Sequence, residues 1–244
     1  PQYSVLLSMP LSLWHWLVHT NAGLWTRIAL GCAIFLTLAL LDLRQNGKHA
    51  TRWHEYGFLL ACTLAAIAYG IINDQITSRI SWEYFYFGKG LDSVLGSQLP
   101  PNPAQLHYQA MFVGIKATWG VGLIIGAAIL LANNPRKAQP QLPYRHLFLA
   151  LTLIFIIAAG CGTILGIASY FGLPTHFSND FSQMVAHNEF RPYRFMTVFG
   201  IHLGGYIGGL IGCAAAILYI HYQRIKVGKS LIPTSESHGF QDRC

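Results

Sequence analysis

The sequence predicts an all-α integral membrane protein, a bundle of five transmembrane helices preceded by a short interfacial helix at the N-terminus. Three observations predict this class. The chain is 53% hydrophobic and only 10% charged, whereas soluble domains carry about 25% charged residues. Its mean hydropathy is positive, at +0.40. Five apolar runs approach or exceed the roughly 20 residues that a spanning helix needs.

The N-terminal segment, residues 5–19, is apolar but too short to cross a bilayer. Pro10 suits the first position of a helix, and Trp14 and Trp16 suit a membrane interface. These features predict a short helix lying on the outer surface. A sixth membrane-embedded element in the same segment is the alternative.

The five predicted spans cover residues 24–41, 53–72, 110–132, 147–171 and 195–220. The second has a short apolar core, because residues 57–72 would extend only about 24 Å against a hydrocarbon layer of about 30 Å. We therefore expect this helix to continue past Asp74 toward Ile80. Asp74 would then lie at the membrane boundary.

Lysine and arginine predict the orientation of the spans. Segments 42–56, 133–146 and 221–244 hold ten of these residues, and segments 1–23, 73–109 and 172–194 hold four. The positive-inside rule then places the N-terminus outside and the C-terminus in the cytoplasm.

We predict one transmembrane domain over residues 1–227 and a disordered cytoplasmic tail over 228–244. The net charge of +7 reflects these loops, and no nucleic-acid-binding motif accompanies it.

The last span carries a stripe of small residues at four-residue spacing. Such stripes allow close approach of helices in a membrane. Packing within the chain is one interpretation, and a homodimer through the stripe is the other. The stripe consists of Gly200, Gly204, Gly208 and Gly212.

Two of the nine acidic residues follow the second apolar run. On an unbroken helix Asp74 and Glu83 would point to opposite faces, since nine residues turn the chain by about 900°. They could share a ligand only if the helix breaks between them, and the short polar and β-branched residues of 76–81 permit a break. A surface ion pair between Arg79 and Glu83, with Asp74 as a cap or in a pair with Lys116, is the simpler alternative.

A divalent transition metal at the outer ends of the helices is the sharpest functional hypothesis. Mixed carboxylate and imidazole ligands suit Zn, Fe or Mn, and an ionisable group within a span often marks a functional site. His202, about two turns into the last span, is such a group. The candidate ligands are Asp74, Glu83, His187 and His202, with His107 as a further one.

The pattern Y-G-x-x-x-D-Q-x-T followed by E-Y-F resembles a group of uncharacterised bacterial polytopic inner-membrane proteins. The resemblance covers most of residues 55–215 and implies a bacterial inner (plasma) membrane, but it implies no reaction. Members of the group often carry His where this chain has Asn73. The motif residues here are Tyr69, Gly70, Asp74, Gln75, Thr77, Glu83, Tyr84 and Phe85.

Other functions compete with the metal site. A non-enzymatic membrane subunit or assembly factor would use the glycine-rich spans and the aromatic stretch 82–87 to pack against a partner. A transporter or channel would line its path with Lys116, His202 and Asp74. A haem protein would use His54, His146 or His202. Motifs for a nucleophile, a phosphate loop or a dinucleotide are absent from the sequence, so whether the chain is an enzyme is left open.

Overall fold

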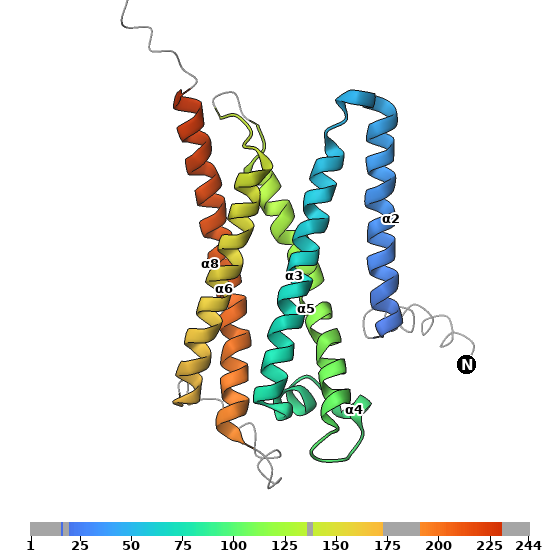
Figure 1. Ribbon diagram of the computed structural model, residues 1–244, viewed down its shortest axis with the longest axis vertical. Helices are drawn as coiled ribbons and strands as arrows, with labels where there is room; N and C mark the ends of the chain where they lie inside the picture. Colours follow the sequence, from blue (N-terminus) through green and yellow to red (C-terminus); the bar gives the residue numbers. More distant parts are fainter. Residues whose placement is uncertain (1–15, 17–19, 136–138, 173–190, 231–244) are drawn as a thin grey trace, which may run out of the picture. The chain divides into compact units, whose positions relative to one another are not determined.

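The computed structural model describes residues 16, 20–135, 139–172 and 191–230 (Figure 1). Within these ranges the chain is helical, without a β-strand. Five of its helices are long and apolar enough to cross a membrane, which confirms the predicted class of multi-pass helical membrane protein. In chain order the elements are α2 (Asn21–Asn46), η1 (Gly47–His49), α3 (Arg52–Ile80), η2 (Tyr84–Gly88), α4 (Asp92–Leu95), α5 (Pro103–Ala132), α6 (Tyr144–Tyr170) and α8 (Pro192–Ser230).

The helices extend beyond the apolar runs that predicted them. The continuation of the second helix to Ile80 is confirmed. Helix α5 begins seven residues earlier than its run, because Asn102 caps it and Pro103 occupies its first position. The Asn102 side chain accepts hydrogen bonds from the backbone N–H groups of Ala104 and Gln105 at 3.0 and 3.3 Å. A search for apolar runs does not detect polar first turns of this kind.

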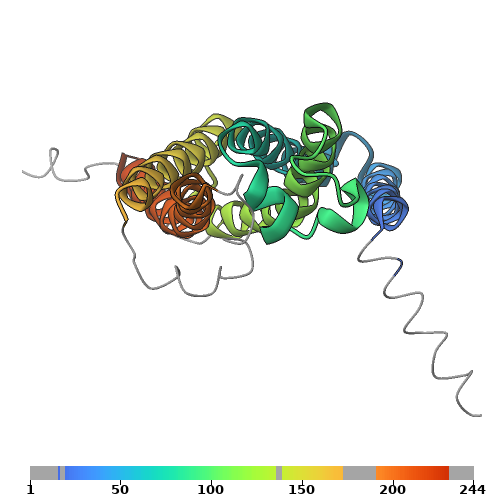
Figure 2. The same ribbon diagram turned by 90° about the horizontal axis from the view of Figure 1, so that it is seen from below.

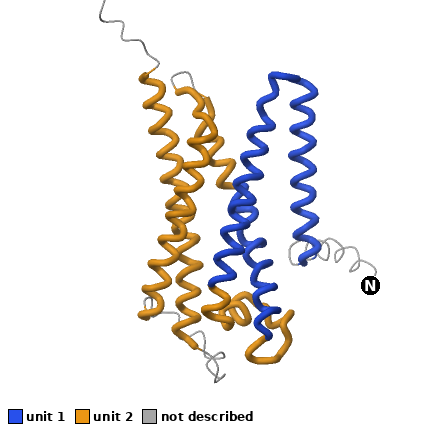
Figure 3. The backbone as a smooth tube through the Cα atoms, viewed as in Figure 1, with its two compact units in different colours: residues 1–76, 102–123 blue, residues 77–101, 124–244 orange. Residues whose placement is uncertain are grey.

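The contacts divide the chain into two compact units (Figure 3). Unit 1 comprises residues 1–76 and 102–123, and unit 2 comprises residues 77–101 and 124–244. The prediction of a single domain over 1–227 stays a prediction. Of the proposed interfacial helix at 5–19 only Trp16 lies within the described residues, where it is 40% exposed. The proposed tail lies outside them beyond Ser230.

In unit 1, α2 and α3 form a hairpin closed by a buried carboxylate. Asp42 is 6% exposed and accepts hydrogen bonds from the Asn46 side chain at 2.7 Å and the Arg52 backbone at 3.0 Å. Farther along, α3 and α5 meet glycine to glycine. A Cβ added at Gly70 would lie 2.7 Å from the Gly114 carbonyl oxygen, so neither position has room for a side chain.

In unit 2, α6 and α8 lie side by side along their length (Figures 1 and 2). The predicted glycine stripe of α8 is buried in this interface. A Cβ at Gly204 would lie 2.4 Å from the Cys161 carbonyl oxygen, and one at Gly208 would lie 2.7 Å from the Cys161 Cβ. Packing within the chain, the first of the two interpretations, is therefore confirmed. A homodimer through the same glycines would have to displace α6.

The connection between α5 and α6 is held by one buried arginine. Arg224 of α8 is 2% exposed, and its guanidinium donates to the carbonyl oxygens of Ala132 at 2.6 Å, Gln139 at 2.8 Å and Pro140 at 3.1 Å, and also to that of Asn134. The carbonyl groups that α5 leaves unpaired at its end thereby gain a charged donor. From the sequence, Arg224 was predicted only to help orient the spans. Its hydrogen bonds to the connection between α5 and α6 were not predicted.

Candidate carboxylate–histidine site

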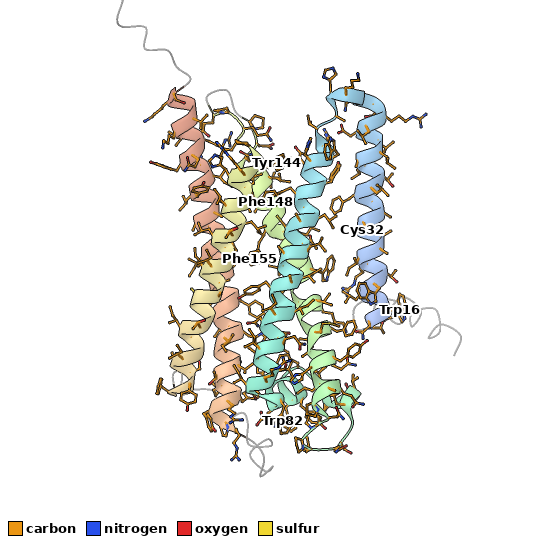
Figure 4. The ribbon with its side chains drawn as sticks, viewed as in Figure 1. Trp16, Cys32, Trp82, Tyr144, Phe148 and Phe155 are labelled. Carbon is orange, nitrogen blue, oxygen red and sulfur yellow. The ribbon has the colours of Figure 1, made fainter. Side chains whose placement is uncertain are left out.

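The candidate site of unit 2 begins where α3 ends. Ser81 follows the last helical residue, and its hydroxyl accepts a hydrogen bond from the Tyr84 backbone N–H at 3.2 Å. Such a side-chain acceptor starts a new helical segment. The helical residues 82–83 that follow Ser81 lead into the π-helical turn η2, a geometry that is frequent at functional sites. Trp82 lies at this end of the helix (Figure 4).

Glu83 is the buried acid of this segment. Its side chain is only 1% exposed. One carboxylate oxygen accepts from the Ser81 hydroxyl at 2.6 Å and the other accepts from the Arg191 backbone N–H at 3.1 Å. Neither donor is the Arg79 guanidinium, which the surface ion pair would have required. The carboxylate therefore ties the segment after α3 to the start of α8.

His202 reaches the same segment from α8. Its side chain is 8% exposed, and its Nε2 lies 3.3 Å from the Thr77 hydroxyl. The imidazole stacks on the Tyr84 ring with centroids 4.9 Å apart, and the Phe85 ring meets it edge-on at 6.0 Å. Tyr84, which stacks on His202, directly follows Glu83 in the chain, so the segment after α3 carries both the buried acid and the contact to the buried imidazole. We call Thr77, Ser81, Glu83, Tyr84 and His202 the Glu83 cluster.

A cation lies at the edge of the Glu83 cluster. The Lys89 ammonium is 5.3 Å from the centroid of the Tyr84 ring, within the range of a cation–π interaction. Phe195 also contacts this tyrosine, with ring centroids 5.4 Å apart. These contacts fix the Tyr84 ring, and the Tyr84 ring in turn orients the imidazole of His202.

The predicted ligands are distributed over both units. Glu83 and His202 both belong to unit 2, where Glu83 contacts Ser81 and Arg191, and His202 contacts Thr77 and Tyr84. Asp74 and His107 belong to unit 1, where Asp74 is 3% exposed and its neighbour Gln75 donates to the His107 carbonyl oxygen at 2.7 Å. His187 lies outside the described residues. In the described part of the chain no group of three or more His, Cys, Asp or Glu side chains could hold a metal ion.

Sequence reasoning missed the neutral members of the Glu83 cluster. Thr77 and Ser81 were interpreted only as residues that permit a helix break, yet each is 1% exposed and each supplies a hydrogen bond to an ionisable group. The spacing Ser81-x-Glu83 could have indicated the bond between Ser81 and Glu83, because the two residues lie close together in the chain. The partnership of Thr77 with His202 spans 125 residues and left no local signal.

The fold and the site together define a multi-pass helical membrane protein. A buried carboxylate follows α3, and a buried imidazole lies on α8. Comparison with models of protein families, with curated proteins and with solved structures finds no match. The resemblance to bacterial inner-membrane proteins therefore stays a prediction from the motif residues.

Proposed function

We propose that this multi-pass membrane protein binds a divalent transition metal, Zn, Fe or Mn, through Glu83 and His202. One observation carries the proposal: a carboxylate that is 1% exposed belongs to the same cluster as a buried imidazole. Burial of a carboxylate is costly unless a positive charge or several donors compensate it. Its two hydrogen-bond donors here, a serine hydroxyl and a backbone N–H, are both neutral.

The chemistry of both groups suits a metal. A carboxylate offers about four acceptor positions, and Glu83 uses two of them within the described residues. A ligating histidine is normally oriented by a hydrogen bond between its other ring nitrogen and a neighbouring polar group, and the Thr77 hydroxyl lies 3.3 Å from His202 Nε2. Carboxylate and imidazole together suit the first-row metals named above.

A third ligand is available from the sequence. His187 precedes Arg191, whose backbone contacts Glu83, by four residues. Asp74 and His107 complete the set predicted from the sequence. A metal with three protein ligands would keep an open position, which could activate water or oxygen.

A non-enzymatic membrane subunit or assembly factor is the second candidate, and two observations favour it. The hydrogen bond from the Arg191 backbone makes Glu83 a cap for the start of α8, a structural role that needs no metal. Helix α2 buries only Gly23, Leu24 and Asp42, so most of its apolar surface is open to lipid or to a partner. A partner that co-purifies in gentle detergent would favour this function.

Elemental analysis of the purified protein separates the two candidates. A metal site requires about one divalent metal per chain in the wild type and loss of that metal in E83Q and in H202Q. H146Q is the matched control, because His146 contacts Tyr219 at 3.1 Å, away from the Glu83 cluster. Metal below about 0.1 per chain in every preparation, or equal metal in wild type and E83Q, would leave only the structural role.

The membrane and the orientation are also proposed. The distribution of lysine and arginine supports an outer N-terminus and a cytoplasmic C-terminus, and the motif resemblance supports a bacterial inner (plasma) membrane. The Glu83 cluster would then lie on the extracytoplasmic side. A metal bound there would exchange with the periplasm and not with the cytoplasm.

A further inference from the structure

Two cations of unit 1 lie inside the predicted spans 24–41 and 110–132. Arg27 lies on α2, six residues after the helix begins, and Lys116 lies on α5, thirteen residues after Pro103. Both side chains are half-buried. Charged groups within a span are costly and usually mark a site for a ligand or a partner charge. The sequence analysis assigned no role to Arg27.

The tryptophan of α5 brings the two cations to one face. The Arg27 guanidinium carbon lies 5.6 Å from the centroid of the Trp119 ring. Lys116 precedes Trp119 by three residues on the same helix, a spacing that places both side chains on one face. The charges of Arg27 and Lys116 are close enough to interact. Two positive charges thus converge beside one indole.

The described part of unit 1 supplies no counter-charge to this pair. Arg27 Nε is buried and has no hydrogen-bond partner there, and neither cation forms an ion pair with a described acidic side chain. The first 26 residues contain no Asp or Glu, so the N-terminal segment cannot neutralise the pair. Asp42, the acid of α2, is occupied by Asn46 and the Arg52 backbone at the other end of the helix.

From this convergence we infer that Arg27, Lys116 and Trp119 form a binding site for a phosphate group. Arginine binds phosphate oxygens through a planar set of donors, and lysine adds a point charge. The indole covers one side of the guanidinium and leaves its N–H edge to the ligand. The phosphodiester of an anionic lipid and free inorganic phosphate share this chemistry. The position within spanning helices favours the lipid, because basic pockets between such helices bind lipid head groups.

Native mass spectrometry of the full chain, released from nanodiscs of phosphatidylglycerol and phosphatidylcholine, tests the inference. We expect the wild type to retain one phosphatidylglycerol, and we expect retention to fall at least tenfold in the double variant R27Q/K116Q. The control R44Q/K48Q removes two exposed basic side chains of α2 and η1 and should retain the lipid as the wild type does. R27K/K116R keeps both charges and should retain most of the lipid, which separates loss of the site from loss of the fold.

The remaining measurements distinguish the phosphate of a lipid from free inorganic phosphate. Displacement of phosphatidylglycerol by millimolar inorganic phosphate would support the anion site and assign it to a soluble ligand. Equal retention of phosphatidylglycerol by R27Q/K116Q and the wild type would overturn the inference. Equal retention of phosphatidylcholine and phosphatidylglycerol by the wild type would also overturn it, because the site would then not select negative charge. The metal-binding variant E83Q should retain the lipid normally, so failure of one proposal does not affect the other.

Discussion

At the scale of single residues, two buried ionisable groups, Glu83 and Arg224, contact backbone atoms or a neutral side chain. Glu83 accepts from a serine hydroxyl and a backbone N–H, and Arg224 donates to four carbonyl oxygens. These contacts join segments far apart in the sequence. Loss of one partner leaves the other buried and unsatisfied, which costs about 1–3 kcal/mol.

Glu83 provides the first prediction. E83A removes both acceptors and leaves the Arg191 N–H without a partner, so we expect it to lower the free energy of unfolding by about 1–3 kcal/mol. E83Q keeps the shape and one carbonyl oxygen, and its loss should be smaller. Unfolding in mixed detergent micelles measures both. A larger loss for E83Q than for E83A would contradict the role of Glu83 as an acceptor.

Arg224 provides the second prediction. R224K keeps the charge but cannot reproduce a fork that reaches four carbonyl groups, so the connection between α5 and α6 should loosen. We expect trypsin to cut after Arg136 or Lys137 several times faster in R224K than in the wild type. K226R, two residues along α8, is the control and should be cut at the wild-type rate. Equal rates in R224K and the wild type would show that these hydrogen bonds do not hold the connection.

At the scale of helices, close packing depends on glycines whose positions predicted it from the sequence. The four-residue spacing of the α8 stripe predicted close approach to another helix, and α6 is that helix. The buried positions continue at the same spacing through Ala216 and Ile220 to Arg224. Extending the stripe would therefore have placed Arg224 on the packed face, although its charge suggested a loop.

Helix packing gives the third prediction. In G204A the added Cβ would lie 2.4 Å from the Cys161 carbonyl oxygen, so α6 and α8 must separate, at a cost of about 1–3 kcal/mol. In G209A, the matched control one turn along, the Cβ meets nothing within 4 Å. Alanine there should be neutral or slightly stabilising, because it favours helix over glycine. Thermal unfolding of both variants in detergent measures the difference, and equal midpoints would contradict the packing.

Helix ends were harder to predict than helix cores. The apolar runs located all five long helices, because about 20 apolar residues in sequence are a strong signal. They missed the first turns of α5 and the last turns of α8, where polar side chains continue the helix. In the Glu83 cluster the sequence predicted the two ionisable groups. The bonds to Thr77 and Arg191 depend on contacts between distant segments, which no local pattern records.

At the scale of the whole molecule, we propose that the five spans of the described residues place Asn21 and Ser230 on opposite sides of the membrane. This follows from their odd number, while the direction follows from the basic loops. We expect alkaline phosphatase fused after residue 140 to be inactive and green fluorescent protein fused at the C-terminus to fluoresce. An active phosphatase after residue 140 would reverse the orientation and move the Glu83 cluster to the cytoplasmic side.

The most direct test of the central claim is anomalous X-ray diffraction from crystals of the metal-loaded protein. We expect one anomalous peak about 2.0–2.2 Å from a carboxylate oxygen of Glu83 and from an imidazole nitrogen of His202. The peak should disappear in H202Q while the hydrogen bonds of Glu83 to Ser81 and Arg191 persist. Absence of a peak near Glu83 in the wild type, with both hydrogen bonds in place, would contradict the metal site.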